Sequence, residues 1–146
     1  MSNEYAVCVG IGVLVLWQGN VLLGERKGSH GRGQFATPGG HLEYLESFEH
    51  CARREVYEET NLTLKNIRFL RVCNLLTYAP KHYVDIGFLA ESEVATPVVK
   101  EPQKVVSWEW YELDKLLTPL FAGTEFLLDS YRSGRSYWDA AGEVRY

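Results

Sequence analysis

The chain has few cysteines and no long apolar run. Its three cysteines, Cys8, Cys51 and Cys73, are an odd number and lack the spacing of a zinc site. The longest apolar run, residues 6–17, contains two glycines and is shorter than the roughly 20 residues that a membrane helix needs. The first four residues lack the positive flank of a signal peptide. We therefore expect a reduced, cytoplasmic protein with no disulfide and no membrane partner.

Positive charge is not in excess either. Fifteen basic and nineteen acidic residues give a net charge of -4, so no global basic field attracts a nucleic-acid polymer. The pattern G-x-x-x-x-G-K-[ST] is missing, which excludes a P-loop. No internal repeat or low-complexity tract occurs. The remaining composition, 46% hydrophobic, is that of a globular protein, and the length suits a single domain over residues 1–146.

Hydrophobic patterning predicts a mixed sheet with helices, which places the fold in the α/β or α+β class. Two strands, residues 6–17 and 21–26, are joined by a Gln-Gly-Asn turn into a hairpin. Further strands are expected at residues 67–76, 83–91 and 105–111, and helices at residues 47–60, 112–117 and 121–131. The tail, residues 133–146, contains glycine and aromatic residues.

The helix at residues 47–60 has clear ends and an unusual apolar face. Ser47 can cap its first turn, and Asn61 follows its last turn, where a left-handed residue often ends a helix. At 100° per residue, Glu55 and Glu59 fall within the apolar stripe that includes Phe48, and the next carboxylate, at position 58, falls at its edge. This placement costs free energy, because half-buried carboxylates repel one another and resist ionisation.

Three arrangements can relieve that cost. The carboxylates of Glu55, Glu58 and Glu59 can be protonated, can pair with Arg54, or can bind a divalent cation. Side chains at i, i+3 and i+4 can converge on one point, and ligands made only of oxygen suit Mg²⁺ or Mn²⁺ better than Zn²⁺. A surface helix with ordinary ion pairs is the alternative at this stage.

Residues 40–62, GHLEYLESFEHCARREVYEETNL, resemble the Nudix box of the Nudix hydrolases. That signature reads glycine, five residues, glutamate, seven residues, then R-E-U-x-E-E-x-G-U, where U is aliphatic. The matching positions are Gly40, Glu46, Arg54, Glu55, Val56, Glu58, Glu59 and Leu62. Asn61 stands where the family has glycine, and asparagine is the next best residue for a left-handed helix end.

The resemblance extends over about residues 6–121. The F-x-x-P-G-G-H-L-E, H-Y-V and W-E-W-Y stretches are similar to the mutator-type nucleoside triphosphate diphosphatases of plants and animals, some of which act on oxidised nucleotides. This similarity implies the Nudix α/β/α sandwich, with the box as a loop-helix-loop. It also implies metal-dependent hydrolysis of a phosphoanhydride bond in a nucleoside triphosphate, yielding a monophosphate and pyrophosphate.

The resemblance also assigns roles to the box residues. It implies that Glu58 and Glu59 are metal ligands, and that Glu55 is a further ligand or the general base. Arg54 is expected to orient a glutamate, and the backbone carbonyl of Gly40 to complete the metal shell. The implied metal is Mg²⁺, for which Mn²⁺ can substitute.

Substrate-binding residues are expected outside the helix. The phosphate-binding candidates are Arg26, Lys27 and Arg32, and the candidates for the base are Phe35, Thr37, His82, Tyr83, Asp85 and Phe121. Asp85 lies in an apolar strand, where it can accept a hydrogen bond from a base or pair with an arginine. Trp108 and Trp110 share one strand face and are expected in the core.

Other functions are compatible with the same motif. The substrate can instead be ADP-ribose, a nucleotide sugar or a dinucleoside polyphosphate. A non-catalytic module that binds nucleotide is a further alternative, which the retained glutamates disfavour. A homodimer is also possible, and the aromatic tail residues Tyr137, Trp138 and Tyr146 can either cover its interface or pack on their own domain.

Overall fold

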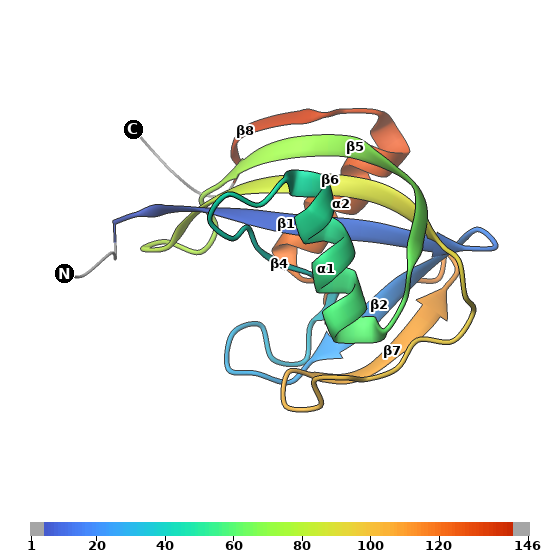
Figure 1. Ribbon diagram of the computed structural model, residues 1–146. Helices are drawn as coiled ribbons and strands as arrows, with labels where there is room; N and C mark the ends of the chain where they lie inside the picture. Colours follow the sequence, from blue (N-terminus) through green and yellow to red (C-terminus); the bar gives the residue numbers. More distant parts are fainter. Residues whose placement is uncertain (1–4, 142–146) are drawn as a thin grey trace.

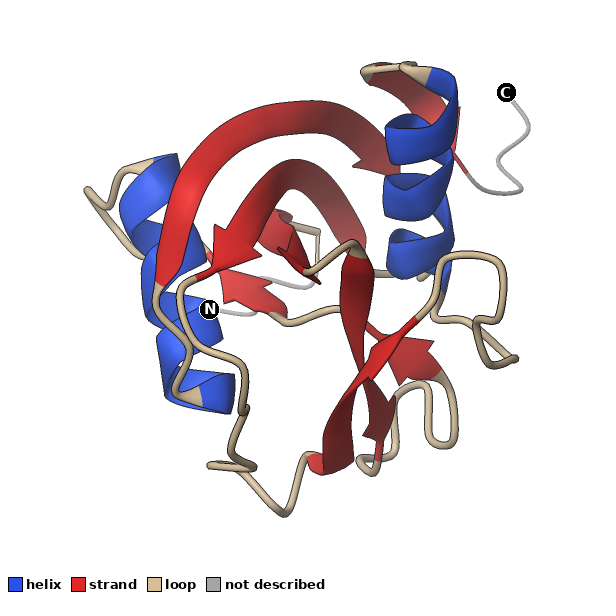
Figure 2. Ribbon diagram, turned by 90° about the vertical axis from the view of Figure 1, so that its right-hand side faces the viewer, coloured by secondary structure: helices blue, strands red, loops and turns tan. Residues whose placement is uncertain are grey.

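A twisted mixed sheet lies between two helices (Figures 1 and 2). The structure, a computed structural model, describes residues 5–141. The elements are β1 (Val7–Trp17), β2 (Asn20–Arg26), β3 (Phe35–Ala36), β4 (Gly39–His41), α1 (Phe48–Thr60), β5 (Leu64–Leu75), β6 (His82–Ser92), β7 (Val105–Tyr111), α2 (Ala122–Ser133) and β8 (Tyr137–Ala141). Neither helix in this part of the chain is long and apolar enough to cross a membrane.

The sheet is mixed because two of its strand pairs are parallel. The strand order is β3-β2-β1-β6-β5-β8, with β4 beside β1 and β7 beside β2. The pairs β1–β6 and β5–β8 are parallel, and the other pairs are antiparallel. Figure 2 shows α1 and α2 on opposite sides of the sheet. The predicted α+β class, a mixed sheet with helices, is therefore confirmed.

Alternation along β1 divides the core into two clusters. Ile11, Val13 and Val15 pack in the cluster that contains the buried side chains of α1. Leu14 points to the other face and packs in the cluster that contains Leu127 of α2. Successive side chains of a strand point to opposite faces, so β1 contributes side chains to both clusters.

The central strands lie where the sequence pattern predicts them. In the β1–β2 hairpin, Leu16 pairs with Val21, and the turn residues Gln18 and Gly19 have φ of 50° and 82°. Two consecutive positive φ angles are typical of the turns that match the right-handed twist of a hairpin. β7 has the predicted bounds, β6 is one residue longer than predicted at each end, and β5 begins three residues earlier and ends one residue earlier than predicted.

The helix predicted at residues 112–117 is wrong. The segment forms a turn, in which the backbone N–H of Lys115 donates to the carbonyl of Glu112. Leu113 and Leu116 pack against the α2 cluster, and Pro119 disfavours helical backbone at the residue before it. The packing of Leu113 and Leu116 against this cluster, together with the nearby Pro119, therefore outweighs the apolar spacing that predicts a helix.

The tail forms a strand that the sequence pattern does not indicate. β8 pairs with β5, and its Trp138 donates from Nε1 to the hydroxyl of Ser130 at 2.8 Å and packs on Phe126. Trp138 therefore packs on its own domain, whereas Tyr137 is 63% exposed. Tyr146 lies outside the described residues.

Candidate active site

Both ends of α1 are fixed by its capping residues. The Ser47 hydroxyl accepts a hydrogen bond from the backbone N–H of His50 at 3.1 Å. At the other end, Asn61 has a φ of 64° and donates its N–H to the carbonyl of Tyr57. Asparagine thus adopts the left-handed conformation expected at this position. The caps fix where the helix begins and ends.

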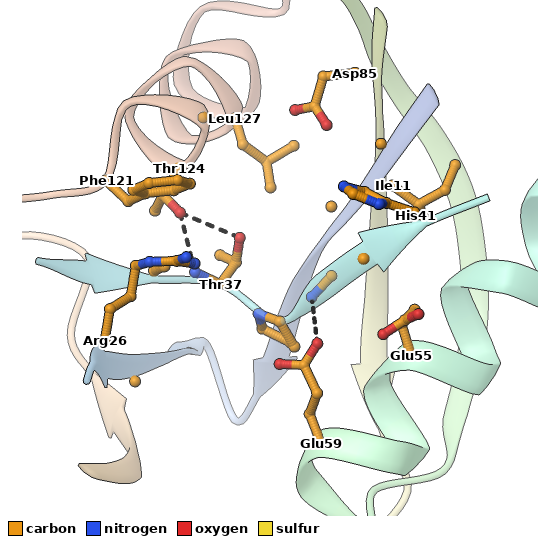
Figure 3. Close-up of a pocket in the computed structure, with 18 of the residues that line it drawn as sticks. Ile11, Arg26, Thr37, His41, Glu55, Glu59, Asp85, Phe121, Thr124 and Leu127 are labelled. Atoms are coloured by element: carbon orange, nitrogen blue, oxygen red, sulfur yellow. Dashed lines mark hydrogen bonds between the residues drawn. The ribbon is translucent and has the colours of Figure 1, made fainter. Parts of the chain in front are cut away.

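The buried stripe of α1 does not include Phe48. The buried side chains of this helix are Cys51, Ala52, Val56 and Thr60. Phe48, which the sequence pattern places on the same stripe, is 47% exposed. Glu55 and Glu59 flank the stripe and line a cavity, and Glu58, on the outer side, is 52% exposed. The helix therefore presents two of its three carboxylates to the cavity (Figure 3).

The carboxylate of Glu59 is largely buried and has no ion-pair partner among the described residues. Its Oε1 accepts a hydrogen bond from the backbone N–H of Gly39 at 3.3 Å. Burial raises the pKa of Glu59 to about 8, and the nearby carboxylate of Glu55 adds to the rise. A bound cation would stabilise the ionised form of this unpaired carboxylate.

Glu55 lies against the backbone of Gly40. A Cβ atom at position 40 would overlap the carboxylate of Glu55, so only glycine leaves room for it. Burial raises the pKa of Glu55, and Arg54 opposes this rise through a hydrogen bond and its charge. β4 and α1 thus place the Gly40 backbone and the Glu55 side chain in direct contact.

We predict that Gly40→Ala displaces the carboxylate of Glu55 but lowers the free energy of unfolding by no more than about 1 kcal/mol, because the overlapped atoms are the far end of a flexible side chain and can move aside. The matched comparison is Gly39→Ala, whose Cβ atom would overlap the backbone carbonyl of Ile11 and should destabilise the protein by about 1–3 kcal/mol, the usual effect of overpacking. Denaturant unfolding of both variants measures the difference. Equal stability of the two variants would contradict the freedom of the Glu55 side chain to move.

Arg54 connects the helix to the preceding loop. Its Nε and Nη2 donate to the two carboxylate oxygens of Glu46 at 2.6 and 2.8 Å, and its Nη1 donates to Glu55 at 2.8 Å and to Glu58 at 3.3 Å. This fork lowers the pKa of Glu46 and raises that of Arg54. Glu46 also accepts from the backbone N–H of Glu43, which closes the loop. Arg54 therefore orients Glu55 from outside the cavity.

The three helix carboxylates do not converge in this conformation. Within residues 5–141, no three histidine, cysteine, aspartate or glutamate side chains form a metal-binding group. Glu58 is turned toward Arg54, whereas Glu59 is turned toward Gly39. The chemistry of the pair in the cavity nevertheless fits a hard divalent cation, since Glu55 and Glu59 offer oxygen ligands and Glu59 is buried without a counter-ion.

The cavity has a volume of about 680 Å³ and extends from α1 across β4 to α2. It brings together many of the residues predicted from the sequence, namely Arg26, Thr37, Gly40, Glu55, Glu59, Tyr83, Asp85 and Phe121. In Figure 3, the two glutamates lie on one side of the cavity and Asp85 and Leu127 on another. An elongated ligand can therefore contact the carboxylates and the far end at once.

Several predicted binding residues do not line this cavity. Lys27 and Arg32 lie outside it on the loop after β2. Phe35 packs on Tyr111 in the α2 cluster, and His82 shares a hydrogen bond of 2.6 Å with the side chain of Asn74. The side chains of Phe35 and His82 are engaged elsewhere, and none of these four residues lines the cavity.

Arg26 forms the mouth of the cavity together with aromatic side chains. Its guanidinium lies 4.2 Å from the ring centre of Phe121, and its Nε donates to the carbonyl of His30 at 2.9 Å. Tyr78 stacks on Phe121 with 5.2 Å between ring centres. Burial lowers the pKa of Arg26, which nevertheless stays cationic because arginine is not deprotonated in proteins. A positive charge is thus held across the cavity from the glutamates (Figure 3).

The structure adds residues that the sequence pattern does not single out. Thr124 of α2 accepts a hydrogen bond from the backbone N–H of Thr37 at 3.0 Å and so fixes the chain before β4. Lys104 lines the cavity and is paired with Glu101 at 3.1 Å. Arg71 also lines it, from β5. The same strand carries Lys65 and Arg68, so the sequence pattern does not distinguish Arg71 from them.

Comparison with known proteins identifies the family to which the chain belongs. The NUDIX domain family matches residues 7–131. Among curated proteins, an NAD-capped RNA hydrolase NudC of Haemophilus influenzae is 30% identical over 116 residues, which are 78% of this chain and 42% of that protein. An oxidized purine nucleoside triphosphate hydrolase of Danio rerio is 29% identical over 105 residues, which are 71% of this chain and 65% of that protein. The chain thus spans about two fifths of the NudC proteins it matches.

A solved structure agrees with this result. The MutT NUDIX hydrolase from Burkholderia pseudomallei has a TM-score of 0.79 and 31% identity, and the match covers 85% of this chain and 97% of that one. The NUDIX domain of Shewanella oneidensis NrtR, complexed with ADP ribose, has a TM-score of 0.71 at 22% identity, covers 88% of this chain and 86% of that chain, and shows the fold alone. The chain belongs to the NUDIX domain family, and its MutT-like neighbours indicate an enzyme of the hydrolase class.

Proposed function

We propose that this protein hydrolyses a phosphoanhydride bond in a nucleoside triphosphate and yields a nucleoside monophosphate and pyrophosphate. The observation that carries the proposal is the arrangement of charges in one cavity. Glu55 and Glu59 enter it from α1, and Arg26 enters it from the opposite side. A polyphosphate needs both a cation held by carboxylates and a basic side chain to neutralise its charge.

Glu55 and Glu59 would hold a divalent metal, for which we propose Mg²⁺ with Mn²⁺ as a substitute. Such an ion neutralises charge on phosphate oxygens and lowers the pKa of bound water. Glu58 completes the proposed ligand set and must leave Arg54, which its exposed position permits. The Gly40 carbonyl is the proposed backbone ligand, next to Glu55.

The chain's own residues supply the remaining functions. Arg26 is stacked on Phe121 and offers its guanidinium to a phosphate group. Arg54 holds Glu55 in place through Nη1, whether Glu55 binds the metal or accepts a proton from water. Glu59 is largely buried, which strengthens its interaction with a cation.

The test is Mg²⁺-dependent pyrophosphate release from a panel of oxidised, methylated and ordinary nucleoside triphosphates. We expect turnover of at least one triphosphate and none after chelation of the metal. Turnover of ADP-ribose, a nucleotide sugar, a dinucleoside polyphosphate or an NAD-capped RNA, without turnover of any triphosphate, would replace the proposed substrate. Binding of nucleotide without turnover of any compound would instead identify a non-catalytic module.

The pH dependence of stability provides a further prediction. Since burial raises the pKa of Glu59 from 4.5 to about 8, the folded metal-free protein holds a proton that the unfolded chain releases. The free energy of unfolding should therefore fall as pH rises through this window, by up to about 1.4 kcal/mol for each pH unit. Urea unfolding of the wild type and of Glu59→Gln on either side of the window measures the effect as a difference. Parallel pH profiles for the two proteins would show that Glu59 ionises freely.

We also propose a homodimer, for which the exposed side chain of Tyr137 leaves a surface available. Size-exclusion chromatography with light scattering gives the mass directly. A monomer at micromolar concentration would reject the dimer without affecting the proposed reaction.

A further inference from the structure

Two of the three helix carboxylates lie at the end of α1 that disfavours negative charge. The last turn of this helix, residues 57–60, contains Glu58 and Glu59 and no basic residue. The aligned peptide dipoles give a helix a partial negative charge at its C-terminal end, so anionic side chains destabilise that end. Glu59 reaches the cavity from this turn (Figure 3). The position of the buried carboxylate therefore depends on a turn that its own residues weaken.

The loop between β6 and β7 stabilises this turn from outside the helix. The last carbonyls of an α-helix have no partner within it, and the loop supplies partners for three of them. The backbone N–H of Val98 donates to the carbonyl of Thr60 at 2.8 Å, and the backbone N–H of Lys100 donates to the carbonyl of Glu59 at 3.3 Å. The side-chain Nζ of Lys100 donates to the carbonyl of Tyr57 at 3.2 Å. Lys100 thus contacts the backbone on both sides of residue 58.

Lys100 also brings the positive charge that the last turn lacks. Its Nζ lies 4.3 Å from the ring centre of Tyr57, so the ammonium contacts both the ring and the carbonyl of that residue. A cation near the last carbonyls of a helix interacts favourably with the helix dipole, and an ammonium over an aromatic ring gains a further attraction. Lys100 is not among the residues that line the cavity. It therefore acts on the helix and not on a ligand.

We propose that Lys100 is a positioning residue for the metal site, because it keeps the last turn of α1 formed and so keeps Glu59 in the cavity. The inference rests on the proposed function, in which Glu59 binds a divalent cation. A turn that is open part of the time presents Glu59 for only a fraction of the time, and the apparent dissociation constant of the cation rises as that fraction falls. Loss of the ammonium should therefore weaken metal binding while every group that contacts the metal is retained.

Lys100→Met tests this role, because it removes the charge and keeps an unbranched side chain. We expect the Mg²⁺ concentration for half-maximal hydrolysis to rise by about threefold to tenfold, the size of a helix-end charge combined with a cation–π contact. At saturating Mg²⁺ the kcat should match the wild type, because the bound ion itself holds Glu59 in the cavity. The control Lys115→Met changes another exposed lysine, which pairs with Glu112, and should leave both quantities unchanged.

The dependence on Mg²⁺ separates positioning from a general loss of stability. A variant that only loses folded protein lowers the rate by the same factor at every Mg²⁺ concentration. Such a uniform loss in Lys100→Met, or an unchanged half-maximal concentration, would overturn the inference. Lys100→Arg should stay close to the wild type, since a guanidinium also donates N–H groups and stacks on aromatic rings. If Lys100→Arg behaves like Lys100→Met, the cation has no role and the inference is overturned.

Hydrogen exchange in the metal-free protein measures the turn itself. The N–H of Asn61 donates to the carbonyl of Tyr57 at 2.9 Å, and its exchange should be faster in Lys100→Met by a similar factor. The N–H of Cys51, which donates to the carbonyl of Ser47 at the other end of α1, is the internal reference and should exchange at the wild-type rate. Equal exchange of Asn61 in the variant and the wild type would contradict the proposed role.

The outcome does not depend on the identity of the substrate. If the wild type hydrolyses no triphosphate, the proposed reaction fails, and calorimetry with Mn²⁺ alone tests the inference. The dissociation constant of Mn²⁺ should then rise by about threefold to tenfold in Lys100→Met and stay unchanged in Lys115→Met. Absence of Mn²⁺ binding by the wild type would overturn the inference together with the proposed metal site.

Discussion

Replacing Glu59 with glutamine is expected to lower Mg²⁺-dependent turnover by about 10²- to 10⁴-fold. The amide has the shape of the carboxylate and can keep the hydrogen bond from Gly39, so the fold should be retained. It carries no negative charge and therefore cannot bind the cation or take a proton. Steady-state rates at saturating nucleotide over a range of Mg²⁺ concentrations measure the loss.

Glu49→Gln is the matched control for this change. Glu49 lies on the same helix, is exposed, and pairs with Arg53 on the solvent side. Its replacement should leave turnover unchanged, since exposed ion pairs contribute little. Full activity in the Glu59 variant would reject the assigned role of the buried carboxylate.

Arg54→Lys is expected to lower kcat/KM by about 10- to 100-fold, the usual effect of losing a side chain that orients a metal ligand. Lysine keeps the charge but cannot contact both oxygens of Glu46 and reach Glu55 as well, because it lacks the planar fork. The Mg²⁺ concentration for half-maximal rate should rise. Kinetics at several Mg²⁺ concentrations separate this effect from a loss of folded protein.

The neighbouring substitution Arg53→Lys controls for the loss of a guanidinium on α1. Arg53 pairs with Glu49 and donates to the carbonyl of Leu64, away from the cavity. We expect its kinetics to match the wild type. If both lysine variants behave alike, the fork between Arg54 and the two glutamates has no catalytic importance.

The α1 side of the site could be predicted from the sequence because its determinants are local. Ser47 and Asn61 set the ends of one helix, and helical spacing alone places Glu55 and Glu59 together. The exposure of Phe48, which belongs to the predicted apolar stripe, was not predicted. That error concerns packing between elements, which periodicity within a helix does not contain.

The far end of the cavity could be predicted only in part because it depends on the sheet. Tyr83 and Asp85 share one face of β6 and line the cavity, whereas His82 lies on the alternate position and does not. The sequence shows the alternation but not which face meets the ligand. The ion-pair partner of Asp85, Arg71, is set by the register of β5 on β6, in which Cys73 is opposite Asp85 and Arg71 is opposite Gly87.

The parallel pairing of β1 with β6 has a consequence for the order of assembly. Val7 pairs with His82, and Cys73 pairs with Trp138, so each parallel contact closes a long stretch of chain. Contacts between distant residues form slowly, because the entropy of closing the intervening loop opposes them. The acidic helix α1 can form early because its contacts are local, but the chamber it faces exists only after β1 has paired with β6 and α2 has packed on the sheet.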